Sequence, residues 1–449
     1  MGDGSNLQKG KKKKKTSGSN SKKKKKMTME QSYATKYVSE WVFLDSSSSS
    51  SSSSASVVVD DFGVQLKSSN KVSDKFVFEL HSHSICSDGF LSPTAVVERA
   101  HRNGVSPFSS SFYVWIGCVV ALQCIPEALE AARKFGIKII PGVEISTIFT
   151  SRESGAEEPV HVLAYYGSCG PKGMDELETC LAYIREGRYQ RAKNMISKLE
   201  NLKMPLKWEH VAKIAGIGVA PGRLHVARAM VEAGHVENLK QAFNRYLYDG
   251  GPAYSTGNEL HAEEAVQMIC RTGGVAALAH PWALKNPLAV VRRLKDAGLH
   301  GIEVYRSDGK LAAFSDLADT YDLVKLGGSD YHGRGTHDES DLGSVNLPVM
   351  TLHAFLKVAR PIWCNAFKDI LHNFVEDPSD SSLEKLTKFG KVRNLKAGIN
   401  MNCCNDVIDM CLSSWLTNDE RQEVEFEALR LKLSHTDIKQ SGIQISVVS

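Results

Sequence analysis

Two histidines and an aspartate lie close together in the string that runs from Glu79 to Gly89. Alternate residues of a strand face the same side, so His81 and His83 would point together, and Asp88 would return on the following loop. Two imidazoles and one carboxylate suit zinc, manganese or iron. By itself an H-x-H pair is only modestly specific for a metal, because two hydrogen-bonded core histidines would have the same pattern.

Further ligand-type side chains accompany the later apolar segments, and this repetition is more informative than any single motif. Charged groups at the carboxyl ends of parallel strands converge at the mouth of a barrel, where their buried charge requires compensation. Metal cations would supply that compensation. The further residues are Glu144, His161, His280, Asp330 and His332.

The elements that must position these side chains alternate along the chain from Lys75 onward. Short apolar segments are separated by helical patterns, which is typical of parallel β/α architecture and most simply of a barrel. The longest apolar run, residues 112–125, is shorter than the roughly 20 residues of a membrane-spanning helix, so we expect a buried strand or core helix and no membrane contact. The expected strands are residues 76–80, 137–145, 160–166, 275–279, 301–305 and 323–328, and the expected helices include 93–103, 125–135 and 288–297.

The first 72 residues have a different composition from the rest. Two five-lysine blocks and a serine run cannot bury enough apolar surface to offset the entropy of ordering, so we expect a disordered arm. The lysine blocks, Lys11 to Lys15 and Lys22 to Lys26, would bind polyanions such as nucleic acid or act as a nuclear address, or they are simply a solvated tail. No apolar segment with a small-residue cleavage site follows the lysines, so we expect an intracellular protein with free thiols, cytoplasmic or nuclear.

Two further regions interrupt or follow the β/α pattern. Residues 167–273 read as helical, including residues 175–201 and 262–272, and an insertion at this place would lie over the barrel mouth as a substrate-selecting cap. The division expected is therefore an arm at 1–72, a barrel at 73–166 and 274–358, a helical cap at 167–273, and a helical C-terminal accessory region at 359–449, with residues 382–389 and 417–433 as helical examples.

Taken together, the motifs resemble those of the PHP (polymerase and histidinol phosphatase) phosphoesterases. The string H-x-H-x-x-x-x-D is followed in the family's order by P-G-V-E-I-S at 141–146, A-H-P at 279–281 and G-S-D-Y-H-G at 328–333, and the resemblance spans about residues 76 to 348. The cap strings G-R-L-H-V-A-R at 222–228 and G-G-P-A-Y at 250–254 look like those of members that act as 3′,5′-nucleoside bisphosphate phosphatases or 5′-to-3′ exoribonucleases.

This resemblance implies a distorted (β/α)7 barrel of the α/β class, with a helical cap insertion, a helical C-terminal extension, and two or three divalent metal ions such as Mn, Zn or Fe. It implies hydrolysis of phosphate esters of a nucleotide or of short RNA, and it places Asp88, Glu144 and His332 in the catalytic set. Arg223 with His225 would form the substrate clamp, whereas Arg188, Arg191 and Arg228 are equally consistent with a solvated helix face. The implied ligands are His81, His83, Glu144 and Asp330 for one ion, Glu144, His161 and His280 for a second, and Asp88 and His332 for a third.

The pattern departs from the family at one place. Family members carry a T-D-H-D-type string at the end of the second strand, whereas residues 106–124 here contain no His, Asp or Glu. The flanking helical patterns are intact, as a retained intron or alternative exon would leave them. The third ion would lose a ligand, so we expect weakened or absent activity.

A protein that binds nucleotide or RNA without turnover is therefore the alternative to an active enzyme. A histidinol-phosphate phosphatase or a polymerase-associated domain of the same fold fits less well, because the cap is long and no polymerase region is present.

Overall fold

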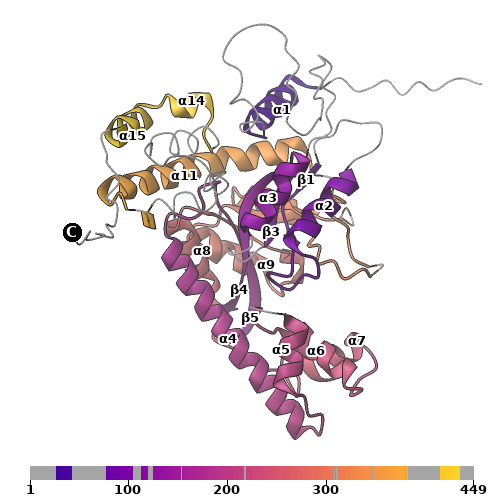
Figure 1. Ribbon diagram of the computed structural model, residues 1–449. Coiled ribbons are helices and arrows are strands. Elements are labelled where there is room, and N and C mark those ends of the chain that lie inside the picture. The colour runs from indigo at the N-terminus through magenta and orange to yellow at the C-terminus, as the bar shows by residue number, and fades with distance from the viewer. Residues whose placement is uncertain are drawn as a thin grey trace, which may run out of the picture.

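The computed structural model describes residues 27–42, 77–104, 113–119 and 125–434, apart from residues 153, 217–218, 308, 310–311, 337, 346, 380 and 383–414. The protein is of the α/β class, as predicted, and it is built around one nine-stranded sheet. Figure 1 shows helices on the sheet and a separate helical group at the far end of a long helix.

The sheet brings the expected strands together in one continuous order. All six strands predicted from the apolar segments are present, and the apolar run at 112–125 contains a seventh, so that run forms a strand and not a core helix. An isolated bridge between Ser82 and Tyr331 joins the first strands to the segment after the last one. The order is β1 (Val77–Glu79), β3 (Tyr113–Val119), β4 (Lys138–Thr150), β5 (Glu157–Tyr165), β7 (Val275–Leu278), β8 (Gly301–Tyr305) and β9 (Val324–Gly327), with β2 (Ser82–His83) beside β3 and β6 (Leu260–His261) beside β4.

One strand runs against the predicted parallel arrangement. β5 pairs antiparallel with both β4 and β7, whereas the other ladders are parallel. The turn that joins β4 and β5 is short, and so short a connection can only form a hairpin, because a parallel return needs a crossover of a dozen or more residues. The reversal places His161, opposite Ser146 in the ladder, near the edge where the parallel strands end.

The two faces of the sheet pack against different helices. Neighbouring residues of β4 illustrate this, because Ile139 belongs to the cluster shared with the α2 and α3 side, and Ile140 belongs to the cluster shared with α11. The helices of the first side are α2 (Pro93–Gly104), α3 (Ile125–Phe135), α8 (Ala262–Arg271), α9 (Pro287–Asp296) and α10 (Ala312–Thr320). The second side is covered by α11 (Val349–Glu376) and α1 (Met29–Val42).

The prediction of a disordered arm over residues 1–72 is wrong for α1. Val38, Trp41 and Val42 are buried, and they pack in the cluster that α11 shares with the sheet. At the start of the helix, Thr28 and Gln31 exchange side-chain and backbone hydrogen bonds that satisfy free N–H groups. The lysine blocks lie outside the described residues.

The insertion between β5 and β6 forms its own helical unit. α4 (Met174–Asn201) is one continuous helix, and its second half packs with the shorter helices around a separate apolar core that includes Met195, Val226 and Met230. In Figure 1 the shorter helices gather at the end of α4, below β4 and β5. They are α5 (Trp208–Ala215), α6 (Arg223–Glu232), α7 (Leu239–Ala242) and the π-helix η2 (Phe243–Leu247).

At the C-terminal side, α11 continues through the boundary expected at residue 358 and contains Pro361 in its interior. α14 (Asn418–Arg421) and α15 (Val424–Ser434) follow, and Phe426 and Leu429 pack with α11. The helices expected at 417–433 are thus present, whereas nearly all of 382–389 lies outside the described residues.

None of the described helices is both long enough and apolar enough to cross a membrane.

Cys169, Cys180, Cys270 and Cys364 are free thiols, as expected, but Cys86 is disulfide-bonded, so the prediction of free thiols is wrong for that residue.

Candidate metal centre

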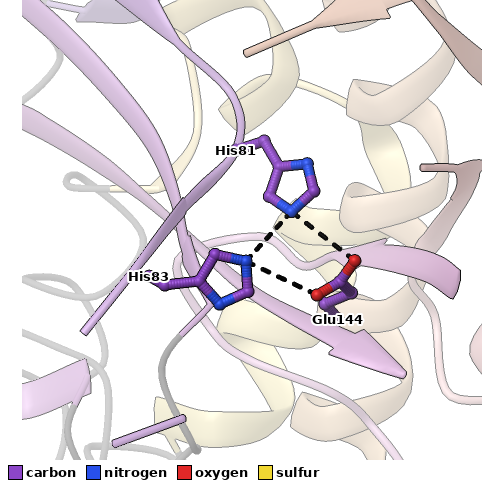
Figure 2. Close-up of side chains that lie close together, drawn as sticks. All are labelled: His81, His83 and Glu144. Carbon is purple, nitrogen blue, oxygen red and sulfur yellow. Dashed lines mark hydrogen bonds and ion pairs between the residues drawn. The ribbon is translucent and has the colours of Figure 1, made fainter. Parts of the chain in front are cut away.

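His81 and His83 point to the same side of the first strands and meet Glu144 of β4 (Figure 2). The two Nε2 atoms lie 3.2 Å apart. Glu144 Oε1 lies 3.6 Å from Nε2 of His81, and its Oε2 lies 3.5 Å from Nε2 of His83. Both histidines are buried and the Glu144 side chain is nearly so, so the ligand atoms of the three residues face one another in the interior.

The backbone at this place is held by the segment that follows β9. His83 N donates to Tyr331 O at 2.7 Å, and Asp330 N donates to His81 O at 2.9 Å. Gly328 permits this approach, because a Cβ there would lie 2.5 Å from His81 N. The glycine of the G-S-D-Y-H-G string therefore allows the Asp330 segment to lie directly against the H-x-H strand.

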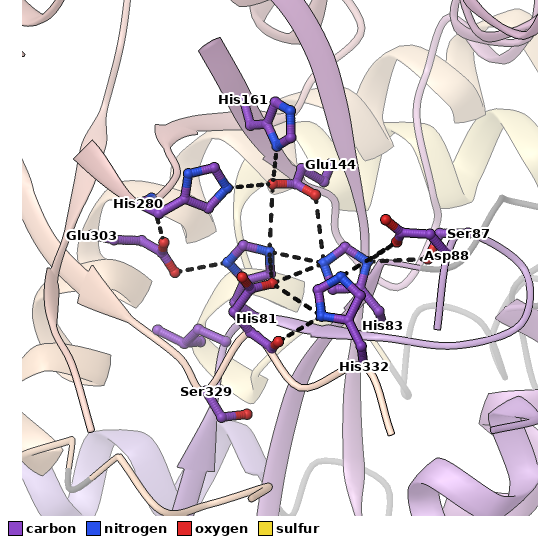
Figure 3. A network of polar contacts seen from close by, with 12 residues as sticks. His81, His83, Ser87, Asp88, Glu144, His161, His280, Glu303, Ser329 and His332 are labelled. Atoms are coloured by element: carbon purple, nitrogen blue, oxygen red, sulfur yellow. Dashed lines mark hydrogen bonds and ion pairs between the residues drawn. The ribbon is translucent and has the colours of Figure 1, made fainter. Parts of the chain in front are cut away.

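Three groups of ligand atoms form, and two residues each belong to two of them. Within each group the atoms lie within 4.8 Å of one another. The groups are His81, His83 and Glu144; His83, Asp88 and His332; and Glu144, His161 and His280. Glu144 and His83 are the shared residues, so the groups form one continuous cluster (Figure 3).

The second and third groups extend the cluster in opposite directions from the first. On one side, Asp88 Oδ1 lies 3.0 Å from Nδ1 of His83 and 3.5 Å from Nε2 of His332. On the other side, Oε1 of Glu144 lies 2.9 Å from Nδ1 of His161 and 3.1 Å from Nε2 of His280.

Asp330 contacts the first group and remains partly open to solvent. Its Oδ1 lies 3.1 Å from Nε2 of His83 and 3.4 Å from Nε2 of His81. The side chains of Asp330 and Asp88 are 40% and 43% exposed, whereas that of Glu144 is 9% exposed. A substrate would therefore reach the cluster from the side of these two aspartates.

Two of these residues have backbone conformations that side chains rarely adopt. His280 has φ 29° and lies two residues after the end of β7, and Asp330 has φ 51° and lies three residues after the end of β9. Such strain persists only where the surrounding structure enforces it, and it is concentrated at functional sites. At both positions the side chain that results points into the cluster.

Two buried carboxylates that the sequence reasoning did not select support the cluster from behind. Glu303 Oε1 accepts from Nδ1 of His81 at 3.0 Å, and its Oε2 accepts from His280 N at 2.7 Å. Glu79 accepts the backbone N–H groups of His81, Ser329 and Gly343. The available signal was an acid within an apolar strand, as in G-I-E-V-Y and V-F-E-L.

The electrostatics of the cluster favour charge on both kinds of side chain. Burial alone would lower the pKa of His83, but the carboxylates of Asp88, Asp330 and Glu144 outweigh burial and raise the pKa to about 10. Burial favours the neutral form of Glu144, yet His161 and the other imidazoles hold its pKa well below the usual range. Protonated imidazoles and ionised carboxylates therefore form several ion pairs in the cluster. A bound metal cation could take the place of the protons.

The donor set fits divalent metal ions. With Nδ1 of His81 donating to Glu303, the Nε2 lone pair faces the cluster, which is the usual arrangement of a metal-bound histidine with an outer carboxylate. Nitrogen and oxygen donors in this mixture suit zinc, manganese or iron. No cysteine among the described residues belongs to the cluster.

The insertion brings cations close to the metal centre. Arg188 Nη2 donates to Ser146 Oγ at 2.6 Å, two residues along β4 from Glu144, and the Arg228 guanidinium lies 3.9 Å from the centre of the Phe90 ring. Arg188 and Arg228 are both partly buried in these contacts.

Of the two expected clamp residues, Arg223 is paired with Asp249 at 2.5 Å. His225 is buried with Nδ1 accepting from Gly222 N at 2.9 Å. Burial lowers the pKa of His225, and the Asp88 carboxylate opposes that shift, which places His225 within electrostatic reach of the cluster. Arg191 binds Glu259 at 2.7 Å, and Arg191 and Arg223 both lie over the ring of Tyr254, at 5.7 Å and 5.6 Å.

The segment that departs from the family pattern corresponds to β3. This strand lies between β1 and β4, as the second strand should, but residues 105–112 and 120–124 lie outside the described part of the chain.

Comparisons with known proteins identify the relatives of this chain. It is 30% identical over 296 residues to a 3′,5′-nucleoside bisphosphate phosphatase of Chromobacterium violaceum, a match that covers 64% of this chain and 94% of that protein. It is 32% identical over 262 residues to a 5′-3′ exoribonuclease of Haemophilus influenzae, covering 57% of this chain and 89% of that protein.

A crystal structure of a metal-dependent phosphoesterase from Bifidobacterium adolescentis superposes with a TM-score of 0.51 at 25% identity, covering 62% of this chain and 95% of that one. No family model matches the chain. The share of the relatives that is covered, together with the cluster of histidines and carboxylates, leads to one conclusion: the chain belongs to the PHP family of metal-dependent phosphoesterases.

Proposed function

We propose that this protein hydrolyses phosphate esters of nucleotides, as a 3′,5′-nucleoside bisphosphate phosphatase, a 5′-to-3′ exoribonuclease on short RNA, or both. The observation that carries the proposal is the continuous cluster in which His83 and Glu144 each belong to two ligand groups. Relatives named for both activities support the substrate class.

The proposal includes a distorted (β/α)7 barrel that holds two or three ions of Mn, Zn or Fe. The hydrogen bonds from the β9 end to His81 and His83 favour a closed sheet, since they join its two ends. The division into an arm at 1–72, a barrel at 73–166 and 274–358, a cap at 167–273 and an accessory region at 359–449 belongs to the same proposal. Three elements modify it: α1 is a structured helix within the arm, α11 crosses the boundary at 358, and α8 packs on the sheet although its residues fall within the cap range.

Each ligand group would hold one ion. His81, His83 and Glu144, with Asp330, would hold the first, Glu144, His161 and His280 the second, and His83, Asp88 and His332 the third. Bound divalent ions supply polarisation of the phosphoryl oxygens and lower the pKa of a water so that hydroxide forms at neutral pH. The carboxylates of Asp88 and Asp330, which face solvent, lie where that water and the phosphoryl group would enter.

The residues of the insertion would bind the part of the substrate that is not cleaved. Arg188 reaches β4 beside Glu144, and guanidinium groups match phosphate oxygens in geometry. His225 is buried in the cap with Nδ1 bound to Gly222 N, and the Asp88 carboxylate influences its pKa, so its ring is close enough to the cluster to contribute to the same binding region. A nucleotide that carries more than one phosphate suits this arrangement, because one phosphate would lie at the ions and another at the cap.

Turnover of two substrates tests the proposal. Phosphate release from adenosine 3′,5′-bisphosphate and nucleotide release from a short 5′-phosphorylated RNA should both require divalent metal and fall at least about a hundredfold in His83→Ala, which removes a ligand from two groups. His210→Ala is the matched control, since His210 lies on the surface of the cap and pairs with Glu232.

The departure from the family pattern at residues 106–124 motivates a second candidate, a protein that binds nucleotide or RNA without turnover. Saturable binding of either substrate with no metal-dependent product would refute the enzyme and support this candidate. Turnover that survives His83→Ala would refute the site.

The lysine blocks are proposed as a separate nucleic-acid contact in a cytoplasmic or nuclear protein. Deletion of residues 1–26 should weaken RNA binding at low salt without changing hydrolysis of the bisphosphate. Unchanged RNA affinity would show that the blocks are only a solvated tail.

A further inference from the structure

A cavity of about 340 Å³ lies between α1, α11 and the residues around α14, and none of the metal-centre residues lines it. Its volume is within the range of pockets that hold small ligands. Figure 1 places α1, α11 and α14 together, apart from the helical insertion. The cavity is therefore a candidate second site, distinct from the metal centre.

One face of α11 forms its floor. His353, Lys357 and Arg360 recur at spacings of four and three residues, so they share that face. Arg360 is already bound: Nε donates to Glu420 at 3.0 Å, Nη1 donates to Trp415 O at 3.0 Å, and Nη2 pairs with the other Glu420 oxygen. Arg360 and Glu420 thus fix the wall in place and offer no free charge.

Lys357 is the free cation of the cavity. Its side chain is exposed, and no carboxylate or other hydrogen-bond partner engages it within the described part of the chain. Pro361 lines the cavity one turn further on, and a proline cannot donate the hydrogen bond that the carbonyl of Lys357 would accept in a regular helix. The Lys357 ammonium is therefore available to an anion, and the hydrogen-bond ladder of the helix is interrupted beside it at Pro361.

His353 provides an unpartnered polar atom in the same wall. The residue is only 9% exposed, and its buried Nε2 has no hydrogen-bond partner among the residues that the structure describes. Buried polar groups are nearly always paired, and an exception in a native structure calls for a missing partner. The ring is bordered by those of Tyr33 and Tyr37, which meet it edge-on at centroid distances of 5.7 Å and 5.2 Å.

The tyrosines supply a surface for a planar ring. Tyr33 is 61% exposed although it is aromatic and borders the cavity, and Tyr37 stands one helical turn away on α1. Aromatic side chains stack on nucleobases without much regard to the base, since every base has a π-face.

We propose that the cavity between α1, α11 and α14 is a second ligand site that binds a nucleoside monophosphate, with its phosphate at Lys357 and its base against Tyr33 and Tyr37. This site is separate from the substrate site of the proposed function and does not depend on it.

Photolabelling of the full chain with 8-azidoadenosine 5′-monophosphate, followed by peptide mapping, locates the ligand. Labelled peptides should derive from residues 27–42 or 349–376, and excess adenosine 5′-monophosphate should remove the label. Lys357→Glu should reduce labelling of these peptides about tenfold or more, because it replaces attraction for the phosphate by repulsion.

Lys36→Glu is the matched control. Lys36 lies on α1, its side chain is 78% exposed, it pairs with Glu40 on the same helix, and it does not line the cavity. Its replacement changes the net charge equally. Labelling in Lys36→Glu, and nucleotide hydrolysis and melting temperature in both variants, should equal those of the wild type.

Three results would overturn the inference. One is labelling confined to peptides of the metal centre, and another is equal labelling of α1 and α11 in Lys357→Glu and wild type. The third is competition by inorganic phosphate as effective as that by adenosine 5′-monophosphate, since the ring would then contribute nothing. Hydrolysis is measured separately, so its absence would count against the proposed function and not against this site.

Discussion

Glu303→Gln tests whether the metal centre depends on a carboxylate that lies outside the three ligand groups and only orients their histidines. Glu303 is 1% exposed and accepts two N–H groups, Nδ1 of His81 at 3.0 Å and the backbone N of His280 at 2.7 Å. Glutamine has the same shape but offers one acceptor oxygen and one NH₂ group. One of the two contacts would therefore set a donor against a donor.

The expected loss follows from the two residues that Glu303 orients, because they belong to different ligand groups. Losing an outer carboxylate typically reduces metal affinity or activity about 10- to 100-fold. At about 1.4 kcal/mol for each factor of ten, this corresponds to about 1.4–2.8 kcal/mol. The value agrees with the loss of one hydrogen bond to a charged group.

Metal affinity by competition with a chelator, and kcat/KM for nucleotide hydrolysis, measure the effect. Glu98→Gln is the control, since Glu98 is exposed on α2 and outside the cluster. A folded Glu303→Gln protein whose metal affinity and kcat/KM both stay within twofold of the wild type would refute the argument that Glu303 orients the ligands.

Three further outcomes follow from the same geometry. Metal-free protein should lose stability as pH rises from about 6.5 toward 10. The pKa of His83 is raised to about 10 in the folded state, so its protonated form stabilises the fold fully below its unfolded pKa of about 6.5 and progressively less above it. A melting temperature that stays constant over this interval would contradict this. Gly328→Ala should lower both metal content and melting temperature, because its Cβ would lie 2.5 Å from His81 N, and a variant with wild-type values of both would show that the segment can move aside. Arg360→Met should destabilise the protein by about 3 kcal/mol in denaturant unfolding, because it removes the cation that pairs with the largely buried Glu420 and leaves that carboxylate with neutral partners such as the backbone N–H of Thr417. A change below about 1 kcal/mol would show that the carboxylate finds other partners.

Much of the fold could be predicted from the sequence, because strands that bury both faces appear as continuous apolar segments. Each predicted apolar segment became a strand within a few residues of its expected ends, and the predicted helices at 93–103, 125–135 and 288–297 are present. The direction of each strand could not be predicted from its apolar pattern. An apolar strand such as β5 has the same pattern whichever way its neighbours run, and only the short β4–β5 connection carried that information.

The structure brings the ligand-type side chains together as the sequence suggested, but it also adds two carboxylates that the sequence reasoning missed. His81, His83 and Glu144 were visible as polar residues in strand-end motifs, whereas Glu303 and Glu79 looked like isolated acids in apolar strands. Their role depends on tertiary contacts, because each carboxylate accepts N–H groups from segments distant in sequence.

The disordered-arm prediction failed at α1 for a related reason. Composition averaged over residues 1–72 is dominated by lysine and serine, so a 14-residue amphipathic stretch is hidden in it. Its buried residues are meaningful only beside α11, which follows more than 300 positions later in the chain.

The position of β3 bears on how the missing acidic string would affect the enzyme. β2, which carries His83, pairs directly with β3, so a ligand at the end of β3 would lie on the His83, Asp88 and His332 side of the cluster. The other two groups share Glu144 and take their remaining members from β1–β2, β5 and the end of β7. Glu144 is the most buried carboxylate of the three ligand groups and contacts four imidazoles, so we expect the departure at 106–124 to affect the His83, Asp88 and His332 end of the cluster and not its centre. We therefore expect a graded loss, in which the third ion binds weakly while the two ions at Glu144 still bind.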